Sequence, residues 1–184
     1  MNDPGHALRD DGWIAGARAV PSPNQDERPE GCTVDLIVVH AISLPPDMFG
    51  GLGVEQLFTN TLDPAEHPYY AGIHQLRVSA HFFIRRDGSL MQFVPVGRRA
   101  WHAGVSSWRG RERCNDFSIG IELEGCDTLA FRVQQYEALA QLIRALRQHF
   151  PAADVCGHSD IAPGRKTDPG PCFDWPRLTA LLAV

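Results

Sequence analysis

Three residues with metal-binding side chains occupy positions 40, 158 and 168 of this 184-residue chain. His40 and His158 each follow a short apolar stretch, and Asp168 lies in a proline-rich segment ten residues after His158. Two imidazoles and one carboxylate form the ligand set of a catalytic zinc site, which leaves a fourth position open. A histidine at a strand end is more often a hydrogen-bonding surface or core residue, so spacing alone indicates a metal only weakly.

Further polar residues favour hydrolytic chemistry. In the stretch "FSIGIELEG", Glu122 and Glu124 leave one face of a predicted strand, and either could serve as a general base near a metal. Lys166, two residues before Asp168, could stabilise the oxyanion of a tetrahedral intermediate. The simpler interpretation makes the glutamates a solvated strand face and the lysine a surface charge. Together with a metal, these groups would hydrolyse an amide.

The elements that must position these residues alternate between strands and helices. Strands are predicted over residues 33–39, which would place His40 at a strand end, over 118–124, and briefly over 153–157 before His158. A hairpin with a tight primed turn at Asp87-Gly88 is predicted within 79–95. The interleaving predicts a single mixed α/β domain over residues 1–184, with one central sheet flanked by helices and the metal site at one edge or face of the sheet.

Helices are predicted in three places. A short one begins at Val54, and the chain from there to about residue 77 is otherwise predicted to be loop. The longest spans residues 130–150, because apolar residues recur at helical spacing until Pro151. A last helix follows Asp174, which is a plausible N-cap, with Pro176 in the first turn.

Composition limits the possible partners. The formal net charge is −5 and no basic stripe is present, which argues against a nucleic-acid partner. No apolar run approaches the ~20 residues of a membrane helix. The first twenty residues lack the pattern of a secretion signal, and five cysteines without a CxxC pair suit reduced thiols. We therefore expect a cytoplasmic protein without a membrane partner.

Four segments resemble one family. The sequences "VVHAISLPP", "HQLRVSAHFFIRRDG", "RAWHAGVSSWRGRERCNDFSIGIELEG" and "GHSDIAPGRKTDPGPCFDW" are similar to AmpD-type amidases, which belong with phage-type lysozymes and peptidoglycan recognition proteins. The resemblance covers about residues 11–175. It implies a zinc hydrolase that cleaves the amide bond between 1,6-anhydro-N-acetylmuramic acid and L-alanine of muropeptides during cytoplasmic cell-wall recycling. We expect an anhydromuropeptide substrate and a monomer.

The resemblance also implies site residues. It assigns His40, His158 and Asp168 to Zn²⁺, selects Glu122 over Glu124 as the catalytic acid/base, and gives Lys166 a role in the transition state. Substrate contacts carried over from the family are Arg77, Trp101, His102, Arg113 and Ala162, of which the two arginines would pair with peptide carboxylates.

Two departures and three alternatives accompany this interpretation. Ala41 follows His40 where the family usually has asparagine, and Cys172 replaces a common serine, which would place a thiol near the metal. The alternatives are a non-catalytic peptidoglycan-binding module, an amidase acting on intact peptidoglycan, and a structural zinc domain. A structural site would be closed by four protein ligands, which disfavours the last of these.

Overall fold

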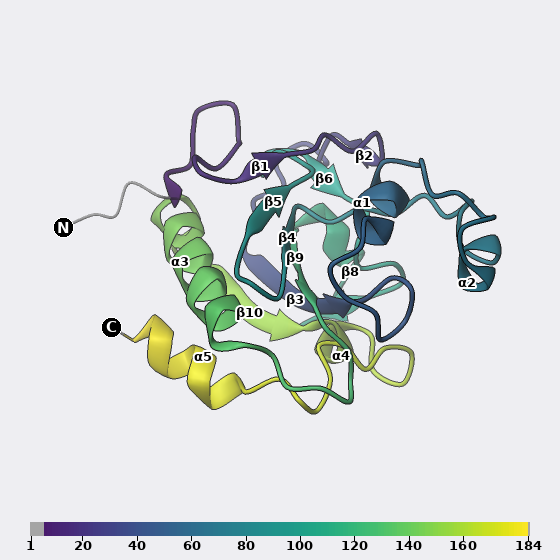
Figure 1. The fold of residues 1–184 in the computed structure, drawn as a ribbon. Coiled ribbons are helices and arrows are strands. Elements are labelled where there is room, and N and C mark those ends of the chain that lie inside the picture. Colours follow the sequence, from purple (N-terminus) through teal and green to yellow (C-terminus); the bar gives the residue numbers. More distant parts are fainter. Residues whose placement is uncertain (1–5, 184) are drawn as a thin grey trace.

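The computed structural model describes residues 6–183, which form one six-stranded sheet with helices packed on it (Figure 1). The strand order is β1-β5-β4-β9-β3-β10. These strands are β1 (Arg18–Ala19), β3 (Leu36–Ile42), β4 (Phe82–Ile84), β5 (Leu90–Gln92), β9 (Ser118–Glu124) and β10 (Asp154–Gly157). Two small ribbons accompany the sheet: β2 (Gln25–Asp26) with β6 (Arg99–Ala100), and β7 (Ser107–Trp108) with β8 (Arg111–Glu112). The predicted mixed α/β domain is confirmed.

The sheet is mixed because one hairpin interrupts a parallel set. β4, β9, β3 and β10 run parallel to one another, whereas β5 is antiparallel to β4. Parallel neighbours bring their carboxyl ends to the same edge, and side chains there can converge. In this register His40 of β3 lies opposite Glu122 of β9, and Gly157 of β10 lies opposite Val39.

β3 begins and ends later than the sequence predicted. The strand spans Leu36–Ile42 rather than 33–39, so His40 is its fifth residue and does not follow its end. Its first five residues are buried, because β9 and β10 cover both edges and apolar clusters cover both faces. The last three residues of β3, 40–42, still pair with β9, where their partners are Glu122, Leu123 and Glu124.

The hairpin is present, but its turn differs from the prediction. Gly88 has a φ of +86°, whereas Asp87 is not among the residues with positive φ, so this is not a two-residue primed turn. The amide of Gly88 donates to the carbonyl of Arg85, and the amide of Arg85 donates to the carbonyl of Ser89. This pattern is a type I turn followed by a left-handed glycine, the usual three-residue hairpin loop.

Five α-helices and the short 3-10 helix η2 lie wholly within the described residues. They are α1 (Gly53–Phe58), α2 (Pro68–Ala71), α3 (Val133–His149), α4 (His158–Ile161), α5 (Trp175–Leu182) and η2 (Cys114–Asp116). The predicted α1, α3 and α5 are confirmed, and the Asp174 side chain caps α5 by accepting from the amide of Arg177. α2 was missed in the region predicted as loop, as was α4 directly after β10.

The two faces of the sheet are covered differently. On one face α3 packs with α5, and their apolar residues join Ile119, Ile121 and Leu123 of β9 in the largest core cluster (Figure 1). Alternation along β9 sends Gly120, Glu122 and Glu124 to the other face, as predicted. That face is covered by irregular segments and short helices. It is therefore the face on which a site can be built from loops.

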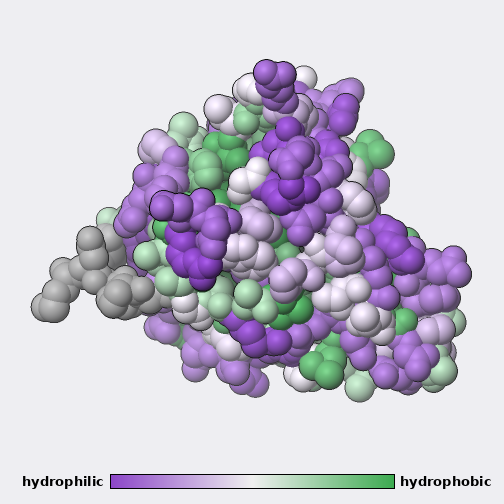
Figure 2. All heavy atoms as spheres, turned by 90° about the horizontal axis from the view of Figure 1, so that it is seen from above, coloured by the Kyte–Doolittle hydropathy of each residue, from purple (hydrophilic) through white to green (hydrophobic). Residues whose placement is uncertain are grey.

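Polar residues dominate the molecular surface seen in Figure 2, where hydrophobic side chains show only as small separate areas. Among the described residues, no helix is both long and apolar enough to cross a membrane. All five cysteines are free thiols, and Cys114 and Cys156 are buried.

Candidate metal centre and active site

The three predicted ligands converge at the carboxyl ends of β3 and β10. His40 Nδ1 lies 2.9 Å from His158 Nδ1, and the Asp168 Oδ2 atom lies 3.1 Å from each of these nitrogens. His40 reaches the site from β3, His158 from the first residue of α4, and Asp168 from the loop before α5. Both histidines are buried, at 1% and 3% exposure. This is the group of metal-binding side chains found among the described residues.

The spacing of the three atoms fits a small tetrahedral ion. Ligands about 2.0–2.1 Å from a zinc ion are about 3.3 Å apart in a tetrahedron, close to the observed triangle of 2.9–3.1 Å. Two neutral imidazoles and one carboxylate are ligands that zinc accepts. The three atoms occupy three corners of a tetrahedron, and the fourth corner faces the cleft. The residues therefore fit a metal with an open coordination position.

His158 is oriented by the segment after β6. Its Nε2 lies 3.1 Å from the carbonyl oxygen of Ala103, which can only accept, so Nε2 carries the proton and Nδ1 keeps a lone pair for the metal. The Arg165 guanidinium donates to the carbonyls of Ala103 and Val105 at 2.7 Å and fixes that segment in place. Arg165 was not predicted as a site residue, because no local pattern links positions about 60 apart in the sequence.

His40 is held by a third histidine. Its Nε2 lies 2.9 Å from Nδ1 of His102, whose Nε2 lies 3.1 Å from the hydroxyl of Ser118. The His40 ring meets both the His102 and the His158 ring at steep angles, with centroids 5.0 and 4.4 Å apart. Both ring nitrogens of His102 are thus engaged by the protein.

Burial and charge keep the ligands in the form that a metal needs. Burial lowers the pKa of His40 to about 4, although its contact with Asp168 opposes that change, so the imidazole is neutral at pH 7. Burial alone would raise the pKa of Asp168, but hydrogen bonds with His158 and His40 hold it well below the usual range. The carboxylate is therefore ionised.

Glu122 is a buried carboxyl group with an unpaired oxygen beside this triangle. Its register partner on β3 is His40, and both residues belong to the cleft lining. The side chain is 8% exposed, and Oε2 has no hydrogen-bond partner. Burial, and then the charge of Asp168, raise the pKa of Glu122 well above its ordinary value, while Lys166 opposes the shift. A carboxyl group of this kind is suited to proton transfer.

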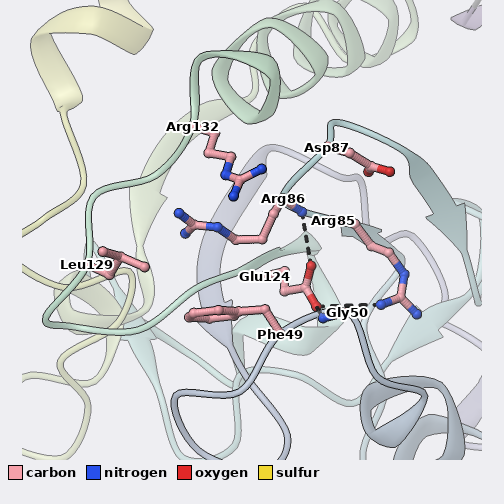
Figure 3. Close-up of a pocket in the computed structure, with 8 residues that line it drawn as sticks. All are labelled: Phe49, Gly50, Arg85, Arg86, Asp87, Glu124, Leu129 and Arg132. Atoms are coloured by element: carbon pink, nitrogen blue, oxygen red, sulfur yellow. Dashed lines mark hydrogen bonds and ion pairs between the residues drawn. The ribbon is translucent and has the colours of Figure 1, made fainter.

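Glu124 has a different environment, shown in Figure 3. Its carboxylate accepts from the amides of Gly50 at 2.5 Å and Arg86 at 3.0 Å, and it pairs with the Arg85 guanidinium at 3.5 Å. These contacts hold the segment after β3 against the β4–β5 hairpin. The simpler interpretation of a solvated strand face does not hold, because both carboxyl groups are buried. Glu124 is fully bonded, whereas Glu122 keeps an oxygen without a partner.

The cleft around the triangle has a volume of about 590 Å³. Lys166 is exposed and lines it, together with His40, His158, Asp168 and Glu122. Asp47, Cys126 and Thr128 contribute to its walls. The predicted residues of the metal and the reaction are thus gathered in one hollow.

The predicted substrate contacts fall in different places. Trp101 and His102 line the cleft, and the Trp101 indole donates to Asp26. Arg113 and Ala162 line a neighbouring hollow that also includes Arg165. Arg77 is exposed beside the cleft-lining residues Leu76 and Val78 but is not itself part of the lining. Cys172, expected near the metal, is half-buried and is absent from the cleft lining.

The twenty-residue segment 156–175 is more regular than a single loop. It contains the end of β10, the short helix α4 and the first residue of α5, with an irregular stretch between the two helices. His158 is placed by α4, whereas Lys166 and Asp168 lie in the irregular stretch. The amide of Ser159 donates to the carbonyl of Asp168 at 2.9 Å and holds the two parts together.

Comparisons with known proteins agree with this geometry. A model of the family described as N-acetylmuramoyl-L-alanine amidase matches residues 30–171. The chain is 60% identical over 177 residues to the 1,6-anhydro-N-acetylmuramyl-L-alanine amidase AmpD of Citrobacter freundii, covering 95% of each chain.

Solved structures give the same result. A crystal structure of a selenomethionine AmpD derivative, 60% identical, superposes with a TM-score of 0.93 over 95% of this chain and 99% of that chain. AmpDh3 of Pseudomonas aeruginosa in complex with an anhydromuramic pentapeptide is 31% identical with a TM-score of 0.59, covering 83% of this chain and 61% of that chain. The protein with the His40–His158–Asp168 centre belongs to the N-acetylmuramoyl-L-alanine amidase family and is a hydrolase.

Proposed function

We propose that this protein hydrolyses the amide bond between 1,6-anhydro-N-acetylmuramic acid and L-alanine in muropeptides, with Zn²⁺ held by His40, His158 and Asp168. The observation that carries the proposal is the buried, unpaired Glu122 carboxyl group beside three metal-binding atoms. The similarity to an enzyme named for this bond, at 60% identity, supports the choice of substrate.

Each residue has a distinct task in the proposed reaction. When bound, the metal polarises the scissile carbonyl and lowers the pKa of water. Glu122 takes a proton from the attacking water and delivers it to the leaving nitrogen of L-alanine. Lys166 places a positive charge where the carbonyl oxygen becomes negative. The raised pKa of Glu122 suits this exchange, because the group must both accept and return a proton near neutral pH.

Substrate recognition is assigned to the surroundings of the cleft. Trp101 offers its half-buried ring to a sugar, and Arg113, next to Ala162 in the neighbouring hollow, offers a guanidinium to a peptide carboxylate. Arg77 would reach the peptide from the rim. His102 lines the cleft as a ring surface, since its nitrogens are engaged by His40 and Ser118. We place the enzyme in the cytoplasm, as a monomer acting in cell-wall recycling.

The experiment that tests the function compares two substrates. Purified anhydromuropeptide and intact peptidoglycan are each incubated with the protein, with and without a zinc chelator, and released peptide is measured. Cleavage of the small substrate that stops with the chelator and returns with Zn²⁺ is the expected result. Cleavage of the intact wall at a similar rate would favour the amidase of intact peptidoglycan. Binding of muropeptide without cleavage would favour the non-catalytic module.

A further inference from the structure

A chain of four polar groups runs from the backbone of η2 to the metal ligand His40. The Ser118 hydroxyl donates to the carbonyl oxygen of Cys114 at 2.6 Å and lies 3.1 Å from Nε2 of His102. On the other side of the ring, Nδ1 of His102 lies 2.9 Å from Nε2 of His40. The remaining nitrogen of His40 is the one that faces His158 and Asp168.

The direction of every hydrogen bond in this chain follows from its first acceptor. A carbonyl oxygen cannot donate, so the single hydroxyl proton of Ser118 points to Cys114. The Ser118 oxygen must then accept, and Nε2 of His102 must carry a proton. In a neutral imidazole the other nitrogen has only a lone pair, so Nδ1 of His102 accepts from Nε2 of His40. His40 is left with a bare Nδ1 aimed at the metal position.

The absence of a side chain at Gly120 makes room for the His102 ring. A Cβ atom at Gly120 would lie 2.4 Å from the His102 ring, so only glycine permits the ring to lie against β9 there. The His81 ring, whose Nδ1 accepts from the amide of Gly120, also meets His102 at a steep angle with centroids 5.9 Å apart. His102 therefore has little freedom to turn away from His40.

We propose that Ser118 and His102 are positioning residues that select the metal-binding tautomer of His40. Metal-bound histidines usually donate their second N–H to a carboxylate, a carbonyl or water, and such partners affect metal affinity. Here the partner is a second imidazole, which either accepts or donates depending on its own tautomer. Ser118 removes that ambiguity. The inference rests on the proposed metal site, but not on the substrate or on the catalytic roles.

The first test measures zinc affinity of the full chain by competition with a chromophoric chelator. Ser118→Ala removes the acceptor that fixes His102, and we expect zinc to bind about ten- to a hundredfold more weakly. Ser106→Ala is the matched control, because the Ser106 hydroxyl is also buried and accepts from the Cys114 amide but touches no imidazole. Wild-type affinity in a folded Ser118→Ala protein would overturn the proposal.

A second pair of variants separates positioning from packing. In His102→Asn, the side-chain oxygen can take the place of Nδ1 and accept from His40, whereas His102→Leu fills the space but accepts nothing. We expect the asparagine variant to keep zinc affinity within a few fold of wild type and the leucine variant to lose it, even if leucine gives the higher melting temperature. Equal affinities in the two variants would contradict a positioning role.

The tautomer itself can be read directly. In the zinc-loaded protein, long-range ¹H–¹⁵N correlation spectra distinguish a protonated from a bare ring nitrogen. We expect His102 to show a proton on Nε2 and a bare Nδ1. A proton on Nδ1 of His102 would overturn the inference even if the protein binds zinc and is fully active, and failure of the amidase assay would leave it standing.

Discussion

Glu122 and Glu124 leave the same face of β9 two residues apart, yet their charges have different uses. Glu124 is bonded to two amides and a guanidinium, whereas Glu122 retains an unpaired oxygen. A carboxylate that is fully bonded stabilises a fold, and one left unpaired in a buried site costs stability. Such a cost is expected where a group is kept for chemistry.

This difference predicts opposite effects of the same substitution. Glu122→Gln should lower kcat by at least about a hundredfold, because general acid–base transfer contributes 10²–10⁴-fold, and should leave zinc content near wild type and the melting temperature at or above it. Glu124→Gln should lower the melting temperature and leave kcat of the folded enzyme within a few fold of wild type. Steady-state kinetics, metal analysis and thermal unfolding of both variants check the prediction. Near wild-type kcat in Glu122→Gln would remove its assigned role.

Asp168 is the one carboxylate among the three ligands. Asp168→Ala should lose zinc on dialysis, because two neutral imidazoles alone bind the ion much more weakly than a set that includes an anionic ligand. Metal content by mass spectrometry, compared with that of Asp174→Ala, checks this, since Asp174 caps α5 and has no contact with the triangle. Stoichiometric zinc in dialysed Asp168→Ala would require a different ligand set.

At the scale of elements, β9 serves two layers at once. On one face, Ile119, Ile121 and Leu123 pack against α3. On the other face, Gly120 leaves room for the His102 ring and Glu122 lines the cleft. A strand in this position tolerates changes poorly on either face. Gly120 is expected to tolerate substitution least, because a side chain at this position would collide with the His102 ring.

Gly120→Ala should therefore damage both stability and the metal centre. Overpacking of a filled interior costs about 1–3 kcal/mol, and displacement of His102 removes the partner of His40. We expect a lower urea midpoint and weaker zinc binding. Gly97→Ala is the matched control, since a Cβ at Gly97 meets nothing within 4 Å. Unchanged zinc affinity in a folded Gly120→Ala protein would show that the ring can shift without effect.

Periodicity and turn residues predicted β3, β4, β5, β9, β10, α1, α3 and α5 but not the two-residue strands, α2, α4 or η2, and motif resemblance predicted the three ligands. The alternation of β9 and the helical spacing of α3 are local patterns, so both elements were predicted from their own residues. The predicted end of β3 was wrong because pairing with β9 extends the strand past its apolar residues. The contacts of Arg165 with Ala103 and of Ser118 with His102 leave no local signal, since they join segments brought together only by the sheet.

At the scale of the whole molecule, buried neutral histidines make stability depend on pH. Burial, assisted by the charge of Arg28, lowers the pKa of His81 to about 3. Its Nδ1 accepts from the amide of Gly120 and its Nε2 lies 3.0 Å from the carbonyl of Arg98, so both nitrogens are satisfied in the neutral ring. A second proton would have to replace the bond from Gly120. The folded protein therefore resists protonation that the unfolded chain accepts.

The sign of the effect follows from this difference. Above an unfolded-state pKa of about 6.5, His81 is neutral in both states and contributes no pH dependence. As the pH falls from about 6.5 towards 3, the unfolded chain binds a proton that the folded protein does not, so stability falls by up to about 1.4 kcal/mol per pH unit. Urea unfolding of metal-free wild type and His81→Asn between pH 7.5 and 5 isolates this contribution, because asparagine can still accept from Gly120 but does not titrate. The wild type should lose more stability than the variant over that range. Equal losses would show that His81 titrates alike in the folded and unfolded states, and a smaller loss in the wild type would show that His81 is already protonated in the fold; either result would contradict the prediction.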